Sequence, residues 1–394
     1  MEYTPNYDNY TLDELLQARS TIDAEAYPER AAELERRIAA FQQSAGTNDP
    51  LHPSSRGSKI RFHGNTNEYF AIWIVNLLLT IVTLGIYSAW AKVRTNRYFY
   101  GNTELDGHRF SYLAEPIQIL KGRIIAAVLF AAYYILGSTN PTAAAILALC
   151  VGLMTPFIVV LGMRFKMRMT AYRNIRFNFK GTYGRAFLVF VLLPVISIFT
   201  LYLLLPWALK KMDQFLVENT GFGDRVFETE LSTSEYYASG LGAFFIALIM
   251  FFVGAVVVGL VMAGAAGNPA LMSLSTFLFV GLYVFIYATA AGFYHGRIRN
   301  HIFATSALPD VARFHSDIPI GGLIMLYLTN TLAIICSLGF AIPWAKIRMA
   351  QFYADATYVD ILPGIEDVVA GDSGSVGATA EEAATLFDVD IALG

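Results

Sequence analysis

The chain has 394 residues, of which 55% are hydrophobic and only 15% are charged, and its mean hydropathy is +0.48. An ordinary soluble domain carries about 25% charged residues, so this composition argues against a typical soluble enzyme. The net charge of −3 comes from residues scattered at the borders of apolar runs. This distribution excludes the continuous basic face expected of a nucleic-acid-binding protein.

Residues 1–60 predict a soluble N-terminal region. The segment is polar and lacks the apolar core of a signal peptide. Pro28 can open a helix that extends to Phe41, because proline is favoured in the first turn of a helix. The stretch 42–58 is rich in Gly, Ser, Asn and Pro and predicts a linker.

Seven apolar runs follow, and none contains Asp, Glu, Lys or Arg. A helix of about 20 residues spans the hydrocarbon core of a bilayer. The runs therefore predict a polytopic membrane protein that is mostly α-helical. They are Tyr69–Ala91, Ile124–Leu136, Thr142–Met163, Ala186–Leu209, Leu241–Ala263, Ala270–Phe293 and Ile318–Ala345. The second run can extend back to Pro116 if the charged ends of Lys121 and Arg123 reach the membrane interface.

Short polar stretches between these runs alternate in the manner of β-strands. Examples are residues 104–112, with a turn signal at Asp106-Gly107, and the segments 176–180 and 224–231. Alternation over four to eight residues beside turn residues is typical of strands and hairpins. We therefore expect short cytoplasmic β-strands at the membrane surface.

The sequence also repeats itself. Thr83–Arg94 matches Ser337–Arg348 at an offset of 254, which places Asn76 over Asn330, and a weaker copy around Pro206 lies at an offset of 117. We therefore expect a repeated transmembrane domain over 61–360. Its three hairpin or helix units lie near 61–110, 178–227 and 313–360, and two transmembrane hairpins, 116–163 and 241–293, lie between them.

Each repeat unit carries a tryptophan followed by basic residues. Tryptophan is favoured at the headgroup level of a membrane, and Lys and Arg are favoured beside the anionic cytoplasmic leaflet. These residues are predicted anchors at the membrane interface: Trp90, Lys92, Arg94, Trp207, Lys210, Lys211, Trp344, Lys346 and Arg348.

Several motifs resemble the YjgN family of bacterial inner-membrane proteins. The motifs are Phe62-His-Gly64, Glu68-Tyr-Phe70, Ile81–Arg94, Tyr98–Thr103, Leu105–Phe110, Leu120–Arg123 and the acidic C-terminal stretch with Glu381 and Phe387–Ile391. The resemblance covers roughly residues 60 to 394. It implies a location in the bacterial inner membrane and an architecture rather than an activity, because the family has no known function.

The basic loops predict the orientation of the chain. Segments 91–123 and 164–185 are rich in Lys and Arg and should be cytoplasmic, whereas the turns 137–141 and 264–269 contain neither residue. We favour a topology in which 69–91, 186–209 and 318–345 are re-entrant hairpins and both termini are cytoplasmic. The alternative is seven full crossings with an inverted three-helix repeat.

No catalytic or metal-binding arrangement stands out, so we predict neither an enzyme nor a cofactor. Six histidines are scattered, and the two cysteines lie in apolar runs. The polar exceptions inside the runs are Asn76 and Asn330, which lie near Thr80 and Thr329. They could line a solute path, or they could hydrogen-bond between helices as packing residues.

The segment 361–394 holds seven acidic residues and no basic residue. It could fold back on the basic loops or bind a cytoplasmic protein, with a solubilising tail as the alternative. The first functional hypothesis is a channel or transporter for a small solute or lipid. The second is a non-catalytic membrane scaffold or assembly factor whose partners are the bilayer and a cytoplasmic protein.

Overall fold

The computed structural model describes residues 19, 22, 27, 31–37, 56–264 and 268–370. The chain divides into two compact units, Met1–Arg56 and Gly57–Gly394. In the first unit, residues 31–37 are helical, within the helix predicted for Pro28–Phe41. Arg37 pairs there with Glu33 one turn earlier at 3.1 Å. The rest of that prediction, the linker up to residue 55 and the acidic segment 371–394 lie outside the described residues.

The described residues from 56 to 370 contain twelve short strands. Their bounds are β1 Arg56–Lys59, β2 Arg61–Phe62, β3 Thr103–Leu105, β4 His108–Tyr112, β5 Thr170–Tyr172, β6 Ile175–Phe179, β7 Thr220–Phe222, β8 Arg225–Val226, β9 Glu228–Thr229, β10 Ser306–Leu308, β11 Ala312–Ser316 and β12 Thr357–Ile361. They form two sheets, one in the order β2-β3-β4-β5-β6-β7-β8 and one in the order β1-β12-β11-β10-β9. The predicted strands at 104–112, 176–180 and 224–231 correspond to β3–β4, β6 and β8–β9.

At each edge, the two sheets are joined by a stretch of chain that bends from one sheet into the other. β1 and β2 are separated by Ile60 alone, and β1 pairs with β12 whereas β2 pairs with β3. β8 and β9 are separated by Phe227 alone, and they pair with β7 and β10 respectively. Strands that bend from one sheet into another make the corners of closed β-structures. The strands therefore close into a ring, which we call the strand ring.

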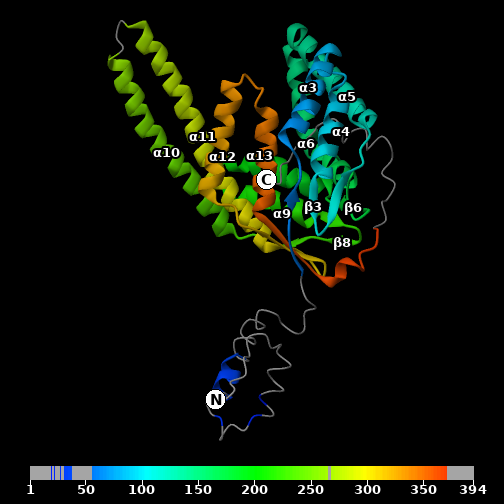
Figure 1. Cartoon of the computed structure of the whole chain (residues 1–394). Coiled ribbons are helices and arrows are strands. Elements are labelled where there is room, and N and C mark those ends of the chain that lie inside the picture. Colours follow the sequence, from blue (N-terminus) through cyan, green and yellow to red (C-terminus); the bar gives the residue numbers. More distant parts are fainter. Residues whose placement is uncertain are drawn as a thin grey trace. The chain divides into compact units, whose positions relative to one another are not determined.

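Helical pairs leave the ring from one end. Successive strands are antiparallel, and the links β3–β4, β5–β6, β7–β8 and β10–β11 are tight turns, so the remaining connections all depart from the opposite end. Each of these five connections is a pair of antiparallel helical segments. Figure 1 shows β3, β6 and β8 beneath helices α3 to α6.

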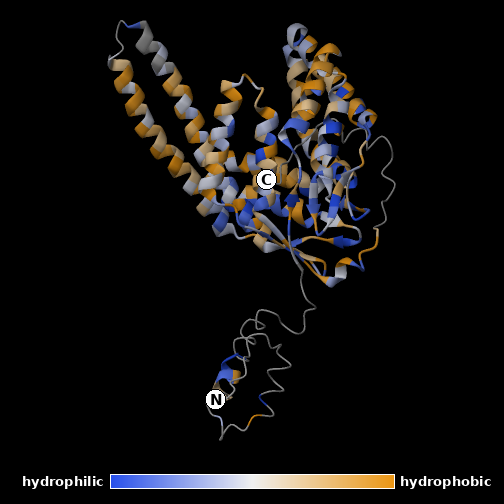
Figure 2. Ribbon diagram, in the orientation of Figure 1, coloured by the Kyte–Doolittle hydropathy of each residue, from blue (hydrophilic) through white to orange (hydrophobic). Residues whose placement is uncertain are grey.

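Two of the five pairs are long. They are α5 Pro116–Thr139 with α6 Pro141–Arg168, and α10 Thr233–Gly264 with α11 Pro269–Thr305. All four helices are long and apolar enough to cross a membrane, and Figure 2 shows hydrophobic residues along their lengths. The helices extend past the predicted hairpins 116–163 and 241–293 and continue to the ring.

The other three pairs are short. They are α3 Thr66–Val82 with α4 Ser88–Gly101, the segment α7 Tyr183–Phe187, η1 Leu188–Leu192 and α8 Leu193–Phe199 with α9 Leu205–Glu218, and α12 Ile320–Cys336 with α13 Ile342–Asp355. Each apolar run predicted at 69–91, 186–209 and 318–345 therefore contains a sharp turn. In chain order the pairs alternate as short, long, short, long, short.

The turns of the three short pairs, which we call the tips, have the same backbone geometry. Leu84, Leu201 and Leu338 each take a left-handed conformation, with φ of 51°, 52° and 52°. The next residue is also left-handed, and its N–H donates to the carbonyl five residues earlier at 2.7–2.8 Å. This bond is typical of the Schellman motif that ends helices. Gly85 and Gly339 suit the second left-handed position, where Tyr202 stands in the middle pair.

A hydroxyl group at each tip satisfies further backbone groups. Thr83 Oγ1 donates to the Leu79 carbonyl at 2.7 Å and accepts the N–H of Tyr87 at 2.9 Å. Ser337 Oγ accepts the N–H of Ala341 at 2.8 Å, and Thr200 does the same for Leu204 at 3.3 Å. The tips thus bond their own polar backbone while their leucines stay exposed.

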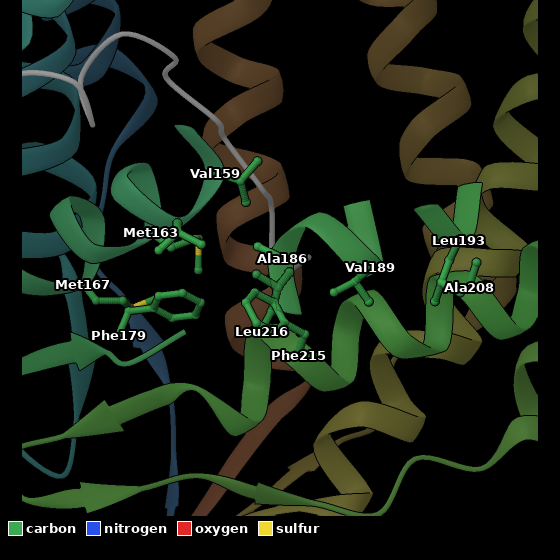
Figure 3. Close-up of a cluster of buried hydrophobic side chains, with 11 residues drawn as sticks. Val159, Met163, Met167, Phe179, Ala186, Val189, Leu193, Ala208, Phe215 and Leu216 are labelled. Atoms are coloured by element: carbon green, nitrogen blue, oxygen red, sulfur yellow. The ribbon is translucent and has the colours of Figure 1, made fainter. Parts of the chain in front are cut away.

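The middle short pair packs against α6 through the buried cluster in Figure 3. Val159, Met163 and Met167 of α6 meet Ala186 and Phe215 from the two arms of the pair. Within the first arm, η1 is a π-helical turn between α7 and α8, just before Pro194. A proline inside a helix lacks the N–H for its bond and collides with the preceding turn, and a π-helical turn accommodates both effects.

Candidate functional site

The interior of the strand ring is apolar. Buried side chains from both sheets meet there in one cluster, including Leu105, Tyr172 and Phe222 from one sheet and Leu308 and Val359 from the other. In a closed ring, alternate residues of each strand point inward. The short strands therefore place one or two apolar side chains each on the axis.

A cavity of about 470 Å³ lies at the helix end of this interior, and we call it the axial chamber. Its walls combine ring residues with the inner ends of four helices. The helical part of the lining includes Tyr100 of α4, Met163 and Met167 of α6, Val217 of α9 and Phe303 of α11. The long and the short pairs thus both contribute to one cavity.

Four phenylalanines separate the chamber from a second, smaller cavity of about 80 Å³ at the turn end. Phe110, Phe177, Phe227 and Phe314 line both cavities. They come from β4, β6, the corner between β8 and β9, and β11. The rings of Phe227 and Phe314 are 5.5 Å apart, within the range of aromatic packing. We call these residues the phenylalanine layer.

Hydroxyl residues begin every strand that receives the chain from a helix. These five residues are Thr103, Thr170, Thr220, Ser306 and Thr357. Four of them donate to the carbonyl four residues earlier, at 2.6–2.9 Å, and Ser306 bonds Thr229 Oγ1 at 2.9 Å. The hydroxyls fasten the last helical turn to the strand.

Tyr172 is a polar member of the ring core. Its hydroxyl donates to the Leu105 carbonyl at 2.9 Å. Burial raises the pKa of Tyr172 to about 12, and the nearby Asp106 carboxylate adds to the effect. The phenol is therefore neutral at physiological pH and acts as a hydrogen-bond donor.

Residues 362–370, which we call the strap, lie against the turn end of the ring. The segment begins with the short 3₁₀-helix η2 Pro363–Ile365. Ile365 lines the smaller cavity, and Val368 is buried in the ring core. Arg173 in the β5–β6 turn pairs with Glu366 at 3.0 Å. The predicted contact between the acidic segment and the basic loop 164–185 is therefore present for this residue.

The residues predicted to line a solute path lie between the arms of two short pairs. Asn76 Nδ2 donates to the Ala91 carbonyl at 3.5 Å, and Asn330 Nδ2 donates to the Ala345 carbonyl at 3.4 Å. Thr80 bonds the carbonyl of Asn76. Thr329 accepts a bond from Arg348, which also bonds Asn330. These residues do not line the axial chamber, and a solute path beside them stays a prediction.

The nine predicted interface anchors lie on the returning arms α4, α9 and α13. Trp90 stacks on Tyr87, with ring centroids 6.2 Å apart. Lys210 bonds Thr233, and the Arg348 guanidinium lies 5.1 Å from the centroid of the Trp344 ring. The set comprises Trp90, Lys92, Arg94, Trp207, Lys210, Lys211, Trp344, Lys346 and Arg348. Their position relative to a bilayer stays a prediction.

Sequence reasoning missed the axial chamber. The available signals were the five hydroxyl residues after the helices and the four phenylalanines, each of which lies two residues after the start of a strand. Within the described residues no group of three or more His, Cys, Asp or Glu could hold a metal ion.

Comparison with known proteins identifies the relatives of the chain. Residues 58–386 match the family described as "Bacterial protein of unknown function (DUF898)". The chain is 27% identical to "Inner membrane protein YjgN" of Escherichia coli O157:H7 over 373 residues, which cover 79% of this chain and 92% of the relative. It is 23% identical to the protein of the same name in Salmonella typhimurium, over 76% and 87% of the two chains. No solved structure matches. These matches confirm the resemblance seen in the sequence motifs.

Proposed function

Since the chain belongs to the DUF898 family of bacterial proteins, whose function is unknown, we propose its role from geometry: a channel or transporter for a small solute or lipid. The relatives are inner-membrane proteins, and four helices have the length and composition of membrane spans. The observation that carries the proposal is the axial chamber, enclosed by the strand ring and by helices from both kinds of pair.

In this proposal the ring lies on the cytoplasmic side. All helical pairs leave it from one end, and the Lys- and Arg-rich segments 91–123 and 164–185 lie at the ring. Basic residues favour the cytoplasmic side of a membrane. The turn at 137–141, at the far end of the first long pair, contains no basic residue. The long pairs then supply four crossings, and both ends of the membrane domain are cytoplasmic.

The short pairs are re-entrant in this arrangement. Their tips expose leucines almost completely, by 94% at Leu84, 84% at Leu201 and 90% at Leu338. Lipid offers no hydrogen bonds, so backbone inside a bilayer must be satisfied by the protein. The hydroxyl caps and the i to i−5 bonds of the tips meet this requirement. The matched tips and the matched bonds of Asn76 and Asn330 also support a threefold internal repeat.

The phenylalanine layer closes the path in the conformation described. Hydrophobic constrictions gate channels by excluding water until side chains or walls move apart. Phe110, Phe177 and Phe314 come from three different strands and Phe227 from a corner of the ring, so a change in the ring would move them relative to one another. The chamber above the layer then acts as the occupied site and the layer as the barrier.

The scaffold remains the second proposal. The layer and the strap together fill the turn end of the ring, and a ring filled in this way would serve as a rigid cytoplasmic platform for a partner protein. We propose no catalytic role, because the chamber is lined mainly by apolar side chains, which supply neither nucleophile nor acid–base group.

Cysteine labelling tests the two proposals. Single cysteines replace Phe177 or Thr220 on the axis and Asn76 or Asn330 in the short pairs, with Cys150 and Cys336 removed. A passage through the ring predicts that a small thiol reagent labels Phe177→Cys in reconstituted protein, and that labelling rises under conditions that promote flux. Complete protection of both axial positions, with labelling of an exposed position such as Arg109→Cys, would favour the scaffold.

A reporter fusion tests the orientation. An insertion at the Asp106-Gly107 turn should report the cytoplasm, and an insertion at 137–141 should report the periplasm. A periplasmic signal from Asp106-Gly107 would contradict the re-entrant arrangement, because the first short pair would then have crossed the membrane.

A further inference from the structure

We propose that the axial chamber binds the hydrocarbon chain of a single-chain amphiphile. This inference deepens the proposed function and rests on it, because it names the substrate class of the same site. A volume of about 470 Å³ falls within the range of about 300–1,000 Å³ that is typical of small-molecule sites.

The walls of the chamber are suited to a flexible apolar ligand. Met163 and Met167 supply unbranched, polarisable side chains, which adapt to irregular apolar partners. The phenylalanine layer forms an apolar floor. A chain that enters from the helix end would therefore meet mainly apolar side chains and stop at the aromatic rings.

The three Ser and Thr hydroxyl groups of the lining have no free donor for a polar solute. Thr170 already donates to the Lys166 carbonyl, Thr220 to the Leu216 carbonyl, and Ser306 to Thr229. A solute with several hydroxyl or charged groups would lose its bound water in the chamber without equivalent replacement. This loss disfavours sugars, amino acids and hydrated ions, and it leaves a hydrocarbon chain as the favoured occupant.

Photolabelling of the full-length protein in lipid nanodiscs tests the site. The probe is a palmitate analogue with a diazirine in its chain, and labelled peptides are located by mass spectrometry. We expect labelling of peptides that contain Met163 or Phe177, and competition by unlabelled palmitate. Competition by a lysophospholipid at lower concentration would identify a lipid rather than a free fatty acid as the source.

A matched pair of substitutions separates the chamber from the lipid-facing surface. Ile60→Trp adds an indole to the chamber lining, and Ile135→Trp makes the same change on the exposed face of α5. We expect Ile60→Trp to lower labelling of the Phe177 peptide at least tenfold and Ile135→Trp to leave it unchanged. Phe314→Ala, which opens the floor without adding bulk, should extend labelling to the peptide with Leu308.

The outcomes distinguish the inference from the proposed function. Labelling confined to the outer faces of the long helices, and unaffected by Ile60→Trp, would overturn the chain-binding site. Flux of a water-soluble solute without chamber labelling would also overturn it, while the transport proposal would stand. Chamber labelling without flux of any kind would support the site and contradict transport.

A separate set of contacts supports a second inference: the strap closes the turn end of the ring. The Leu362 N–H donates to the Val311 carbonyl at 2.8 Å, and the Asp224 N–H donates to the Val369 carbonyl at 3.1 Å. Val368 is only 7% exposed, inserted among ring residues. A side chain at Gly223 would lie within 2.6 Å of the strap, so the strap runs directly over this turn.

The strap is held so that it can be released. Its ion pair, Arg173–Glu366, is exposed on the Glu366 side, and such pairs contribute little to stability. The closure therefore rests on the buried side chain of Val368 together with Ile365 and the backbone hydrogen bonds of the strap. Displacing the strap would connect the smaller cavity with solvent while the ring itself stays closed.

Cysteine accessibility in nanodiscs, where both faces of the protein are reached, tests the strap. Ala312→Cys places a thiol in the smaller cavity, and we expect it to be protected in the parent protein. Val368→Asn should raise its labelling rate at least tenfold, whereas Val369→Asn, on the exposed neighbour, should not. Rapid labelling in the parent, or continued protection in Val368→Asn with an unchanged unfolding temperature, would overturn the closure.

Discussion

The long and the short helical pairs solve the same problem in different ways. A long pair such as α5 and α6 reverses direction at polar residues, where Asn140 caps α6 by accepting the N–H of Ala143. A short pair such as α3 and α4 reverses within an apolar run and exposes Leu84 at its tip. The turn between α5 and α6 is capped by a polar side chain, whereas the short pairs satisfy their turns within an apolar run. The difference shows that an apolar run can contain a turn when the polar backbone groups of the turn are hydrogen-bonded within the protein.

The largest expected effect is the loss of stability when a charge is placed at the tip of a short pair. Leu84→Asp should lower stability by up to about 3 kcal/mol if the tip lies in hydrocarbon, because a carboxylate at that depth is costly. The measurement is denaturation of the reconstituted protein. Tyr358→Asp, on an exposed face of β12, is the control and should change stability little. An equal effect at both positions would place the tip in water and contradict the comparison.

The two buried asparagines should differ from one another. Asn330 Oδ1 accepts from Arg348, whereas Asn76 Oδ1 has no partner. Removing a buried group that has partners costs about 1–3 kcal/mol, while removing an unsatisfied one costs less. Asn330→Ala should therefore destabilise by about 2 kcal/mol more than Asn76→Ala in the same denaturation assay. Equal losses would mean that the bond with Arg348 contributes nothing.

Removing the caps sharpens the comparison. Loss of a helix cap costs about 0.5–2 kcal/mol. The loss of stability in Ser337→Ala should lie at the upper end of this range, because the freed N–H of Ala341 has no water to bond in an apolar tip. The loss of stability in Asn140→Ala should lie at the lower end, since water can accept the N–H of Ala143 in place of the side chain. Thermal unfolding of the two variants measures the difference, and the reverse order would contradict it.

The smallest effect concerns the second left-handed residue of each tip. Gly85 has φ of 92°, and Gly85→Ala should destabilise by about 1 kcal/mol, since a side chain is strained in this conformation. Tyr202 has φ of 63° at the matching position, so Tyr202→Gly should relieve strain and raise the unfolding temperature slightly. A loss of stability in Tyr202→Gly would show that its ring contributes contacts that outweigh the strain.

The membrane helices were predictable because their signal is local. Seven apolar runs and the tip motifs around Gly85 and Gly339 can be recognised from neighbouring residues alone. The strands at 104–112 and 176–180 were also recognised from alternation. Re-entrant hairpins were expected in the runs 69–91, 186–209 and 318–345. The left-handed residues Leu84, Leu201 and Leu338 at their turns were not identified, because they are ordinary apolar residues in the sequence.

The closure of the ring was not predictable for a different reason. It depends on the pairing of β1 with β12, which lie about 300 residues apart, and on bends at Ile60 and Phe227. Strands of two to five residues have too little periodicity to reveal their partners. The chamber follows from that closure. Asn76 and Asn330 attracted notice as isolated polar residues, while the residues that line the cavity are apolar and resemble any core.

The uniform departure of the helical pairs from one end of the ring has a consequence for how such a protein can grow. Each strand–pair–strand segment begins and finishes on the same side, so duplicating or deleting one would leave every other segment in its original orientation. Membrane topology therefore sets no limit on their number. The limit comes from circumference: the strands must meet edge to edge, and one segment more or fewer would change the bore and the cavity within it.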